Sequence, residues 1–479
     1  MRTAHRVAQV RSAEEALLRQ LPDGALMQRA ATALAVACAQ RLGGVYGARV
    51  VLLVGSGNNG ADALWAGARL AARGAAVTAV LSGDAVADAL AALRAAGGRV
   101  GTPDALDEAD LVVDGLVGIG GSGSLRPQAA ELVVEGEHVV AVDVPSGVDA
   151  DTGAVSGPAV RAGLTVTFGT GKPGLFVGAG RLHAGRVEVV DIGLEPYLPE
   201  PDVALLEAVD VAMRLPLREV AGDKYTTGVV GVVAGSQQYT GAAVLATGAA
   251  VRAGAGMVRF AGTEHPAEQV RARWPEAVVM TVPAGDGRAV LDVGRVQAWV
   301  IGPGTGTDDD AAAVLGSVLS SDVPVLVDAD ALTLCAEHPE WLRSRSAATL
   351  LTPHDREFAR FGCEPGGDRV GAVRALSADL GVTVLLKGDA TIVTDGQRVL
   401  VNSTGTPVLA TAGTGDVLSG ACGALLAQGL DPLHAGAVGA YLHGLAADLA
   451  ADGASTSAAQ VLECWPDAVR AVRTGRVQG

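Results

Sequence analysis

Short apolar runs rich in valine alternate with helical stretches along nearly the whole sequence. The runs at 49–54 (RVVLLV) and 138–144 (HVVAVDV) each end in a glycine or a polar turn, and helical segments are expected near 61–73 and 84–97. Buried strands of parallel sheets have this composition, because helices cover both faces of such a sheet. The alternation predicts an α/β fold built on parallel sheets.

A stretch with several prolines divides the alternation into two series. Residues 195–222 contain four prolines and break the pattern, and a second series then runs to helices of small residues at 414–429 and 434–451. A chain of 479 residues is long enough for two large α/β domains. We therefore predict one domain in residues 1–205 and another in residues 206–479.

Charge and cysteine usage exclude several classes of protein. With 36 basic and 52 acidic residues the formal net charge is −16, which argues against binding to nucleic acid or to an anionic membrane. No apolar run reaches the roughly 18 residues of a membrane span, and the N-terminus lacks the apolar core of a secretory signal. Five widely spaced cysteines without a C-x-x-C pair indicate reduced thiols and no zinc site. We expect a cytoplasmic protein.

The first strand runs directly into a glycine-rich turn, GSGNNGAD (55–62), which precedes a helix. A strand, a glycine turn and a helix N-terminus together present backbone N–H groups to an anion. The G-x-G-x-x-G spacing of Gly55, Gly57 and Gly60 is weak evidence in a glycine-rich chain, so a helix cap with a turn is the alternative. Asp62 would repel a pyrophosphate and instead suggests contact with a cation or a ribose.

Acidic residues also end two later strands of the first half, at Asp114 (VVDG) and Asp143 (AVDVPSG). Ligands of open α/β sheets gather outside the carboxyl ends of the strands, so these side chains are expected at one crevice. Asp143, close to Ser146, could act as a general acid or base, or could form an Asx turn. Lys172 in FGTGKPG is followed by proline, and the segment is not a Walker A motif.

The most informative motif of the second half is TAGTGDVLSG (411–420), which enters a helix of small residues. Its glycine-flanked turn at a helix N-terminus can hold a phosphoryl group during transfer. The charge of Asp416 opposes simple anion binding, whereas a carboxylate that accepts a proton from an attacking hydroxyl would need this position. An acid favoured by the helix dipole is the plainer alternative.

Polar residues end three further strands of the second half. Asp328 and Asp330 follow VLV, His354 follows LLTP, and Lys387 follows VTVLL. A lysine at a strand end suits nucleotide phosphates, although a hairpin turn would look similar, and the histidine could simply cap a helix. Together with Asp416, these strand ends of one parallel sheet favour a shared site.

The motifs of the first half occur in the order typical of a known family. They are ALMQRAATALA (25–35), GSGNNGAD (55–62), VVDGLVGIGGSGSLR (112–126), VDVPSGVDADTG (142–153), TFGTGKPGL (167–175) and VEVVDIGL (187–194). In these segments the first half resembles the epimerase domain of the bifunctional NAD(P)H-hydrate repair enzymes. The resemblance implies a Rossmann-like parallel sheet that interconverts the R and S hydrates of NADH and NADPH (NADHX and NADPHX).

The same resemblance implies residue roles. Asp143 would be the acid or base at the epimerised carbon, and Asn59, Asp114 and Ser146 would hold a potassium ion. The residues implied to bind the hydrated nucleotide are Asn58, Asn59, Gly60, Ala61, Asp62, Gly118, Ile119, Gly120, Gly121, Ser122, Gly123, Ser124 and Asp143. The usual GNNGGDG of the family reads GNNGADA here, with Ala61 and Ala63 in place of glycines. A methyl group near a phosphate could weaken binding, so a catalytically silent binding or oligomerisation module is the alternative for this half.

The second half resembles the ribokinase-like, ADP-dependent NAD(P)H-hydrate dehydratase domain of the same family. The matching segments include DKYTTGVVGVVAGSQQYTGAAVLA (223–246), IGPGTG (301–306), VDADAL (327–332), LTPHDREFAR (351–360), LKGDATIV (386–393) and TAGTGDVLSG (411–420). The resemblance implies contacts with the hydrated nucleotide at Ala242, Gly304, His354 and the catalytic Asp416. It implies contacts with ADP at Lys387, Gly388, Asp389, Ala390, Thr391 and Gly415.

The resemblance also implies a reaction. The ring hydroxyl of the S-hydrate is activated by phosphoryl transfer from ADP and leaves as phosphate, a better leaving group than hydroxide, while Mg²⁺ screens the phosphates. The alternative is an ATP-dependent small-molecule kinase of the hydroxymethylpyrimidine type with an accessory or silent nucleotide-binding N-terminal domain. We also expect a homo-oligomer, since helices such as 434–451 could pack against a partner, or else against their own sheet.

Overall fold

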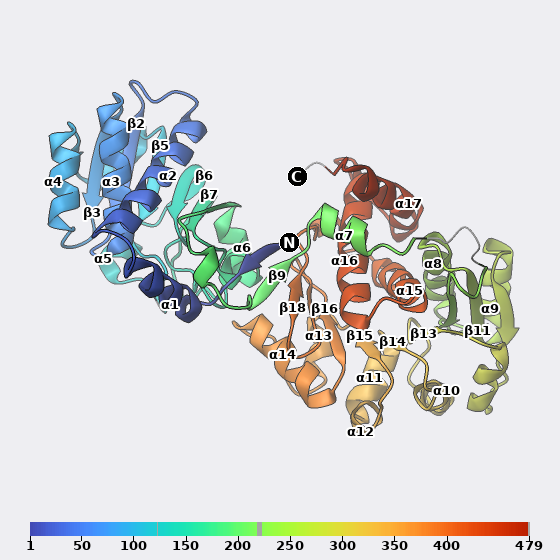
Figure 1. Cartoon of the computed structure of the whole chain (residues 1–479). Helices are drawn as coiled ribbons and strands as arrows, with labels where there is room; N and C mark the ends of the chain where they lie inside the picture. Colours follow the sequence, from blue (N-terminus) through green and yellow to red (C-terminus); the bar gives the residue numbers. More distant parts are fainter. Residues whose placement is uncertain (122, 218–222, 478–479) are drawn as a thin grey trace. The chain divides into compact units, whose positions relative to one another are not determined.

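The computed structural model describes residues 1–121, 123–217 and 223–477 and divides the chain into two compact units (Figure 1). The N-terminal unit consists of residues 2–203 and 367–369. The C-terminal unit consists of Met1, residues 204–366 and the chain from residue 370 onward. Each unit combines a largely parallel sheet with helices, so the predicted α/β class is confirmed.

The N-terminal unit is built on one sheet with the strand order β4-β3-β2-β5-β6-β7-β8, in which each neighbouring pair is parallel. Its strands are β2 (Arg49–Val54), β3 (Ala76–Leu81), β4 (Arg99–Val100), β5 (Leu111–Gly115), β6 (Glu135–Val142), β7 (Arg161–Phe168) and β8 (Arg186–Val190), with a short β1 (Arg2–Ala4) bridged to Gly171. Its helices are α1 (Val7–Leu18), α2 (Ala25–Leu42), α3 (Asn58–Ala72), α4 (Ala87–Ala95), α5 (Pro127–Ala130) and α6 (Gly178–Ala184).

Strand β2 shows why these runs are apolar throughout. Val50 and Leu52 enter the core formed with α1 to α4, whereas Val51 and Leu53 enter a second core on the opposite face of the sheet. Because successive side chains of a strand point to opposite faces, a strand covered on both faces has no position that exposes a charged side chain to water. Charged residues are therefore expected where such a strand ends, which is where the site is built.

The C-terminal unit contains a longer sheet in which the order β9-β18-β17-β16-β15-β14-β13-β10-β11-β12 is found. Its strands are β9 (Val203–Leu205), β10 (Val229–Val233), β11 (Met257–Gly262), β12 (Val278–Thr281), β13 (Ala298–Ile301), β14 (Val325–Val327), β15 (Thr349–Leu351), β16 (Thr383–Leu386), β17 (Ile392–Thr394) and β18 (Val399–Val401). Its helices are α7 (Ala208–Arg214), α8 (Thr240–Arg252), α9 (Glu264–Arg273), α10 (Asp309–Leu319), α11 (Asp330–Glu337), α12 (Glu340–Arg343), α13 (Asp355–Ala359), α14 (Arg369–Leu380), α15 (Thr414–Ala427), α16 (Pro432–Ala451) and α17 (Ala458–Thr474).

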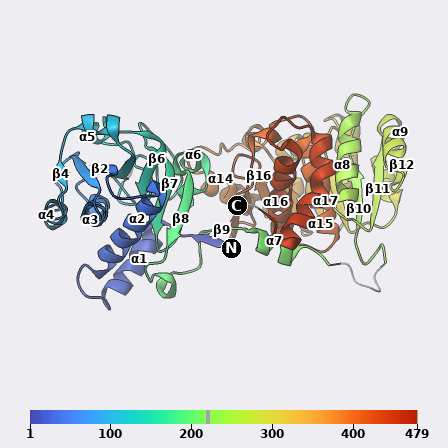
Figure 2. The same cartoon turned by 90° about the horizontal axis from the view of Figure 1, so that it is seen from above.

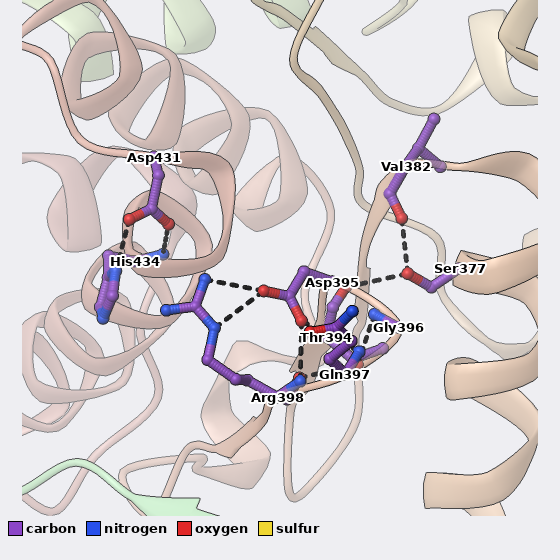
Figure 3. A network of polar contacts seen from close by, with 9 residues as sticks. All are labelled: Ser377, Val382, Thr394, Asp395, Gly396, Gln397, Arg398, Asp431 and His434. Carbon is purple, nitrogen blue, oxygen red and sulfur yellow. Dashed lines mark hydrogen bonds and ion pairs between the residues drawn. The ribbon is translucent and has the colours of Figure 1, made fainter.

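Toward one end of this sheet the pairing is not parallel, because β17 runs antiparallel to both β16 and β18. In the turn between β17 and β18, the carboxylate of Asp395 accepts hydrogen bonds from the backbone N–H groups of Gln397 (3.1 Å) and Arg398 (2.8 Å) (Figure 3). The same carboxylate pairs with the Arg398 guanidinium at 2.7 Å. So short a turn leaves no room for a crossover helix, and the two strands must be antiparallel.

Helices α8, α15, α16 and α17 lie side by side and share one core with a face of this sheet (Figure 2). A Cβ atom on Gly420 of α15 would lie 2.0 Å from the backbone oxygen of Ala246 on α8, and one on Gly439 of α16 would lie 2.3 Å from Cys422 Sγ. The small residues therefore allow close packing inside the unit, and the homo-oligomer stays a prediction. Nowhere in the described chain is a helix long and apolar enough to cross a membrane.

Candidate active sites

The carboxyl ends of β2, β5, β6 and β7 meet at a cavity of about 1260 Å³ inside the N-terminal unit. Parallel strands place these ends at one edge of the sheet, where the chain leaves the apolar layers and polar side chains become possible. Both glycine-rich segments line the cavity, together with Asp143 and Lys172. The size and the polar lining suit a ligand as large as a nucleotide.

Most residues expected to bind the hydrated nucleotide line this cavity, namely Asn58, Asn59, Asp62, Gly118, Ile119, Gly120, Gly121, Gly123, Ser124 and Asp143. Gly60 and Ala61 are not among the lining residues. A Cβ atom on Gly60 would lie 2.1 Å from the backbone oxygen of Gly55, so glycine is required there by backbone packing. Ser122 lies outside the described residues.

The two alanines that replace glycines in the first motif face the protein core. Ala61 is 2% exposed and Ala63 is 0% exposed, and both belong to the core that α1 to α4 share with the sheet. Neither residue lines the cavity. Their methyl groups therefore present no obstacle to a phosphate bound there.

Asp143 forms an ion pair with a buried lysine. The Nζ atom of Lys172 lies 2.6 Å from Asp143 Oδ1 and also donates to Thr167 Oγ1 (2.9 Å) and to the backbone oxygen of Phe168 (3.0 Å). Lys172 is only 1% exposed. Asp143 has a φ of 66°, a left-handed conformation that costs a non-glycine residue on the order of 1 kcal/mol or more. The surrounding contacts therefore hold this carboxylate in one orientation.

The ion pair of Lys172 with Asp143 was not predicted from sequence, because Lys172 was placed in a possible phosphate loop that was then rejected. The small number of lysines in the sequence could have pointed to it. The chain has three lysines, Lys172, Lys224 and Lys387, while its other basic residues are arginine. A compact ammonium group is hard to replace by a guanidinium where one buried point charge is needed.

Asp62 and Glu14 are among the other acidic residues that line the same cavity. Asp62 is 8% exposed, and its Oδ1 atom has no hydrogen-bond partner among the described residues. Burial, supported by the charges of Asp143 and Glu14, raises the pKa of Asp62 well above its usual range. Burial also raises the pKa of Glu14 on α1. One carboxyl group is thus paired with a cation while its neighbours favour the neutral form, an arrangement that can supply both a base and an acid.

The three residues expected to hold potassium surround the carboxyl end of β5. Asp114 is 0% exposed and accepts hydrogen bonds from the hydroxyl (2.6 Å) and the backbone N–H (2.8 Å) of Ser146. The Oδ1 atom of Asn59 would lie 2.6 Å from a Cβ atom on Gly118. Burial raises the pKa of Asp114 to about 6, and no described lysine or arginine pairs with it. A buried carboxylate beside hydroxyl and amide oxygens fits a monovalent cation.

In the C-terminal unit, the polar ends of β14, β15 and β16 meet the start of α15. Lys387 Nζ lies 2.7 Å from Asp328 Oδ1 and 3.9 Å from an oxygen of Glu357. Ser419 on α15 donates to Asp328 Oδ2 at 2.5 Å. A Cβ atom on Gly415 would lie 3.4 Å from Lys387 Nζ. The structure therefore brings the strand ends together and places the lysine beside the turn that carries Asp416.

Asp416 lies in the first turn of α15, where a base was predicted. Burial, followed by the charges of Asp328 and Asp330, raises the pKa of Asp416 to about 7, although Lys387 acts in the opposite direction. Burial lowers the pKa of Lys387, but the carboxylates of Asp328 and Glu357 outweigh it, so that this pKa is raised overall. Near neutral pH the site combines a permanent cation with a carboxyl group that can accept a proton.

The remaining expected contacts with the hydrated nucleotide lie at the start of α8, on the loop after β13 and at the start of α13. Gly304 has a φ of 65°, and a Cβ atom there would lie 3.1 Å from the Cβ atom of Ala242, so these two residues are neighbours. His354 caps α13: its Nδ1 accepts from the backbone N–H of Glu357 (3.2 Å), while the Glu357 carboxylate accepts from the backbone N–H of His354 (2.9 Å). Through Glu357, this cap is connected to Lys387.

The expected ADP-binding segment is the turn between β16 and β17. Gly388 and Asp389 are exposed, whereas Ala390 (2% exposed) and Thr391 (8% exposed) are buried. The hairpin alternative is therefore correct for the backbone, but the turn also presents Lys387 at its start. Only the first part of this turn is open to a ligand.

The described residues offer Mg²⁺ no preformed set of protein ligands. Across the described residues, no three His, Cys, Asp or Glu side chains are grouped so that they could hold a metal ion. Both oxygens of Asp328 already accept hydrogen bonds, from Lys387 and Ser419. The donor set instead fits Mg²⁺ that arrives on the phosphates of a nucleotide.

Family models match both halves of the chain. Residues 23–174 match the model of the YjeF-related protein N-terminus, and residues 230–465 match that of the NAD(P)H-hydrate dehydratase. A bifunctional NAD(P)H-hydrate repair enzyme of Mycobacterium tuberculosis is 52% identical over 445 residues, which cover 90% of each chain. One from Salinibacter ruber is 36% identical and covers 89% of this chain and 88% of the relative.

Solved structures resemble the C-terminal unit. The ADP/ATP-dependent NAD(P)H-hydrate dehydratase of Bacillus subtilis, co-crystallised with ATP and Mg²⁺, is 29% identical with a TM-score of 0.52, covering 57% of this chain and 99% of that chain. A ribokinase-like superfamily protein of Enterococcus faecalis has a TM-score of 0.51 at 25% identity, covering 57% of this chain and 98% of that chain. These relatives confirm the ribokinase-like fold and favour a dehydratase over a small-molecule kinase. The chain belongs to the family of bifunctional NAD(P)H-hydrate repair enzymes.

Proposed function

We propose that this chain repairs the hydrated forms of NADH and NADPH in two steps. The N-terminal unit interconverts the R- and S-hydrates, and the C-terminal unit dehydrates the S-hydrate with ADP, releasing AMP and phosphate. The observation that carries the proposal is the position of Asp416, which lies at the start of a helix beside Lys387 and has a pKa raised to about 7. Membership of the repair family supports both activities.

The dehydration follows from these groups. Asp416 accepts the proton of the ring hydroxyl as its oxygen attacks the β-phosphorus of ADP, and the bond from that phosphorus to the bridging oxygen breaks to release AMP. Lys387 and the backbone N–H groups at the start of α15 neutralise the charge that develops on the phosphoryl oxygens. Mg²⁺ bound with the phosphates would screen their charge. Phosphate then leaves the ring, and loss of a proton from the neighbouring carbon restores NAD(P)H.

The epimerisation uses the cavity of the N-terminal unit. Asp143 serves as the acid or base at the hydroxyl-bearing carbon, and its ion pair with Lys172 fixes the carboxylate. Asp62 and Glu14 line the same cavity, and burial favours their protonated forms. Potassium on Asn59, Asp114 and Ser146 would neutralise the buried Asp114 carboxylate and hold in place the loop that begins at Leu116.

The test follows the absorbance of the reduced nicotinamide ring after the protein is added to a mixture of NADHX epimers with Mg²⁺ and K⁺. Parallel reactions contain ADP, ATP or neither nucleotide. Recovery of all the NADH with ADP, faster than spontaneous epimerisation allows, supports both activities. A plateau once the S-hydrate is consumed leaves only the dehydratase and favours a silent N-terminal unit. A stable phosphorylated product without NADH would refute the repair function and favour the kinase.

We propose further that the enzyme is cytoplasmic and homo-oligomeric. The five cysteines are free thiols, which supports a reducing compartment. Light scattering coupled to size-exclusion chromatography measures the mass in solution, and a monomer at micromolar concentration would refute the oligomer.

A further inference from the structure

Asp328 connects two motifs of the proposed dehydratase site. It follows β14, is 1% exposed, and uses both carboxylate oxygens: Oδ1 accepts from Lys387 Nζ (2.7 Å), and Oδ2 accepts from Ser419 Oγ (2.5 Å). Ser419 is itself fully buried on α15, and its hydroxyl also lies 3.0 Å from the backbone oxygen of Gly415. One side chain thus links the end of β16 to α15 at Ser419, which in turn contacts the first turn of that helix at Gly415.

Its surroundings distinguish Asp328 from a group that reacts. Both of its oxygens are engaged with protein groups, and almost no surface of the residue is exposed. Asp416, by contrast, has no hydrogen-bonded partner of this kind among the described residues and is more exposed. A second carboxylate that is buried behind the lysine and the helix start can act on both of them without touching a substrate.

We propose that Asp328 is a positioning residue for phosphoryl transfer, which fixes Lys387 and, through Ser419, the turn that carries Gly415 and Asp416 in one geometry. The inference rests on the proposed dehydratase function and adds a residue to which no part of the reaction has been assigned. Its physical basis is the sensitivity of such reactions to placement, because a misplacement of about 1 Å can cost about 100-fold in rate.

The charge of Asp328 allows this positioning role to be distinguished from a purely structural one. The charged groups that face Asp416 are Asp328 after β14, Asp330 on α11 and Lys387 after β16, and Glu357 on α13 faces Lys387 in turn. Next to burial, Asp328 makes the largest contribution that raises the pKa of Asp416. Removal of its charge should lower that pKa, whereas loss of a residue that only supports folding should leave it unchanged.

The experiment compares three variants of the full chain. Asp328→Asn keeps the size of the side chain and removes its charge, and Ser419→Ala removes the link to α15. Ser377→Ala is the matched control, because Ser377 is equally buried (1% exposed) and its hydroxyl donates to the backbone oxygen of Val382 at 2.6 Å, in a polar network whose labelled residues do not include Asp328, Lys387 or Ser419 (Figure 3). Initial rates of NADH formation from S-NADHX and ADP are measured against pH and against Mg²⁺ concentration.

We expect Asp328→Asn to lower kcat by about 100-fold and to move the acidic limb of its pH profile to lower pH. Ser419→Ala should lower kcat and leave that limb in place, and Ser377→Ala should match the wild type in both respects. The epimerase activity and thermal unfolding of each variant report whether it has folded. If Asp328→Asn does not fold, the Ser419→Ala result alone decides the proposal.

The outcomes separate the two proposals. A wild-type protein that forms no NADH from S-NADHX and ADP refutes the dehydratase function itself. A wild-type protein that is active, together with an Asp328→Asn variant of unchanged rate and pH profile, overturns the positioning role. A variant that only requires more Mg²⁺ also overturns it, since Asp328 would then be a ligand of the metal.

Discussion

The Nζ atom of Lys172 lies 2.6 Å from Asp143 Oδ1, and the two side chains come from segments 29 positions apart (172 − 143). The lysine is almost fully buried, while the carboxylate faces the cavity. We therefore expect the pair to affect both the stability of the N-terminal unit and the proposed reactivity of Asp143, and the two effects can be measured separately.

Replacement of Lys172 by methionine should lower the rate of epimerisation by about 100-fold or more, because Asp143 loses the group that orients it. It should also destabilise the N-terminal unit by about 3–5 kcal/mol, since a buried carboxylate is left without its partner. The rate of epimerisation is measured by separating the R- and S-hydrates over time. The change in stability is measured by thermal unfolding. The double variant Asp143→Asn/Lys172→Met should unfold at a higher temperature than Lys172→Met and stay inactive. A single variant with wild-type activity would remove Lys172 from the site.

The dehydratase rate should depend on the ionisation of Asp416. Because the base must be deprotonated and burial raises its pKa to about 7, kcat should rise with pH through about 7. Asp416→Asn should lower kcat by about 100-fold or more, which is the usual contribution of a general base. Epimerase activity of the same variant serves as the control for folding. The value of kcat is measured at intervals of about one pH unit between about pH 5 and about pH 9. A kcat that does not change over this range would contradict the role of Asp416 as the base.

The same group should reduce stability at alkaline pH. The folded-state pKa of Asp416 is raised, so its protonated form contributes stability that is fully present below the unfolded pKa and is lost as pH rises through about 7. The Asp416→Asn variant has no carboxyl group to ionise at this position, so its stability does not fall with pH for this reason. The unfolding temperature of the variant relative to the wild type should therefore be higher at alkaline pH than at acidic pH. A difference that does not change with pH would mean that Asp416 is well solvated.

Potassium should affect only the first activity. Replacement of K⁺ by choline should slow epimerisation, because the buried carboxylate of Asp114 loses its counter-ion, and dehydration of pure S-NADHX should not change. Ser146→Ala and Asp114→Asn should both abolish the response to K⁺. Titration with K⁺ and, separately, with Na⁺ at constant ionic strength is the measurement. An equal response of both activities would point to a general salt effect.

Replacement of Ala61 or Ala63 by glycine should change the stability of the N-terminal unit and leave substrate binding unchanged. Ala61→Gly and Ala63→Gly restore the usual glycines of the family but remove methyl groups from the core and loosen α3, at a cost of about 1 kcal/mol each. The KM for either hydrate should remain unchanged, because neither residue lines the cavity. A KM that falls several-fold in either variant would show that the methyl group had obstructed binding.

Much of the fold follows directly from local sequence. The strand predicted at 49–54 is β2 itself, and the helix predicted at 434–451 forms most of α16. Buried parallel strands and small-residue helices have compositions that are set by their immediate neighbours, and this makes them visible in sequence. The β17–β18 hairpin was missed although Asp395-Gly396 is a strong turn signal, because the short run at 399–401 was not recognised as a strand.

The site is less accessible to such reasoning. The polar strand ends Asp328, Lys387 and Asp416 could be grouped from sequence, because the order of a parallel sheet brings them to one edge. The individual contacts could not be predicted from sequence, because the hydrogen bonds of Asp328 with Ser419 and of Lys172 with Asp143 depend on how distant segments pack. Sequence identifies the edge of the sheet at which chemistry occurs, and packing then selects the partners.

The close contact at Gly420 limits how sequences of this kind can vary. Any side chain at Gly420 would force α15 away from α8, and Asp416 lies one helical turn earlier on the same rigid element. Such a shift would disturb the core and at the same time move Asp416 relative to Lys387. Substitutions of Gly420 should therefore lower both the stability of the protein and its turnover. A mutant library that seeks faster variants should hold this glycine constant.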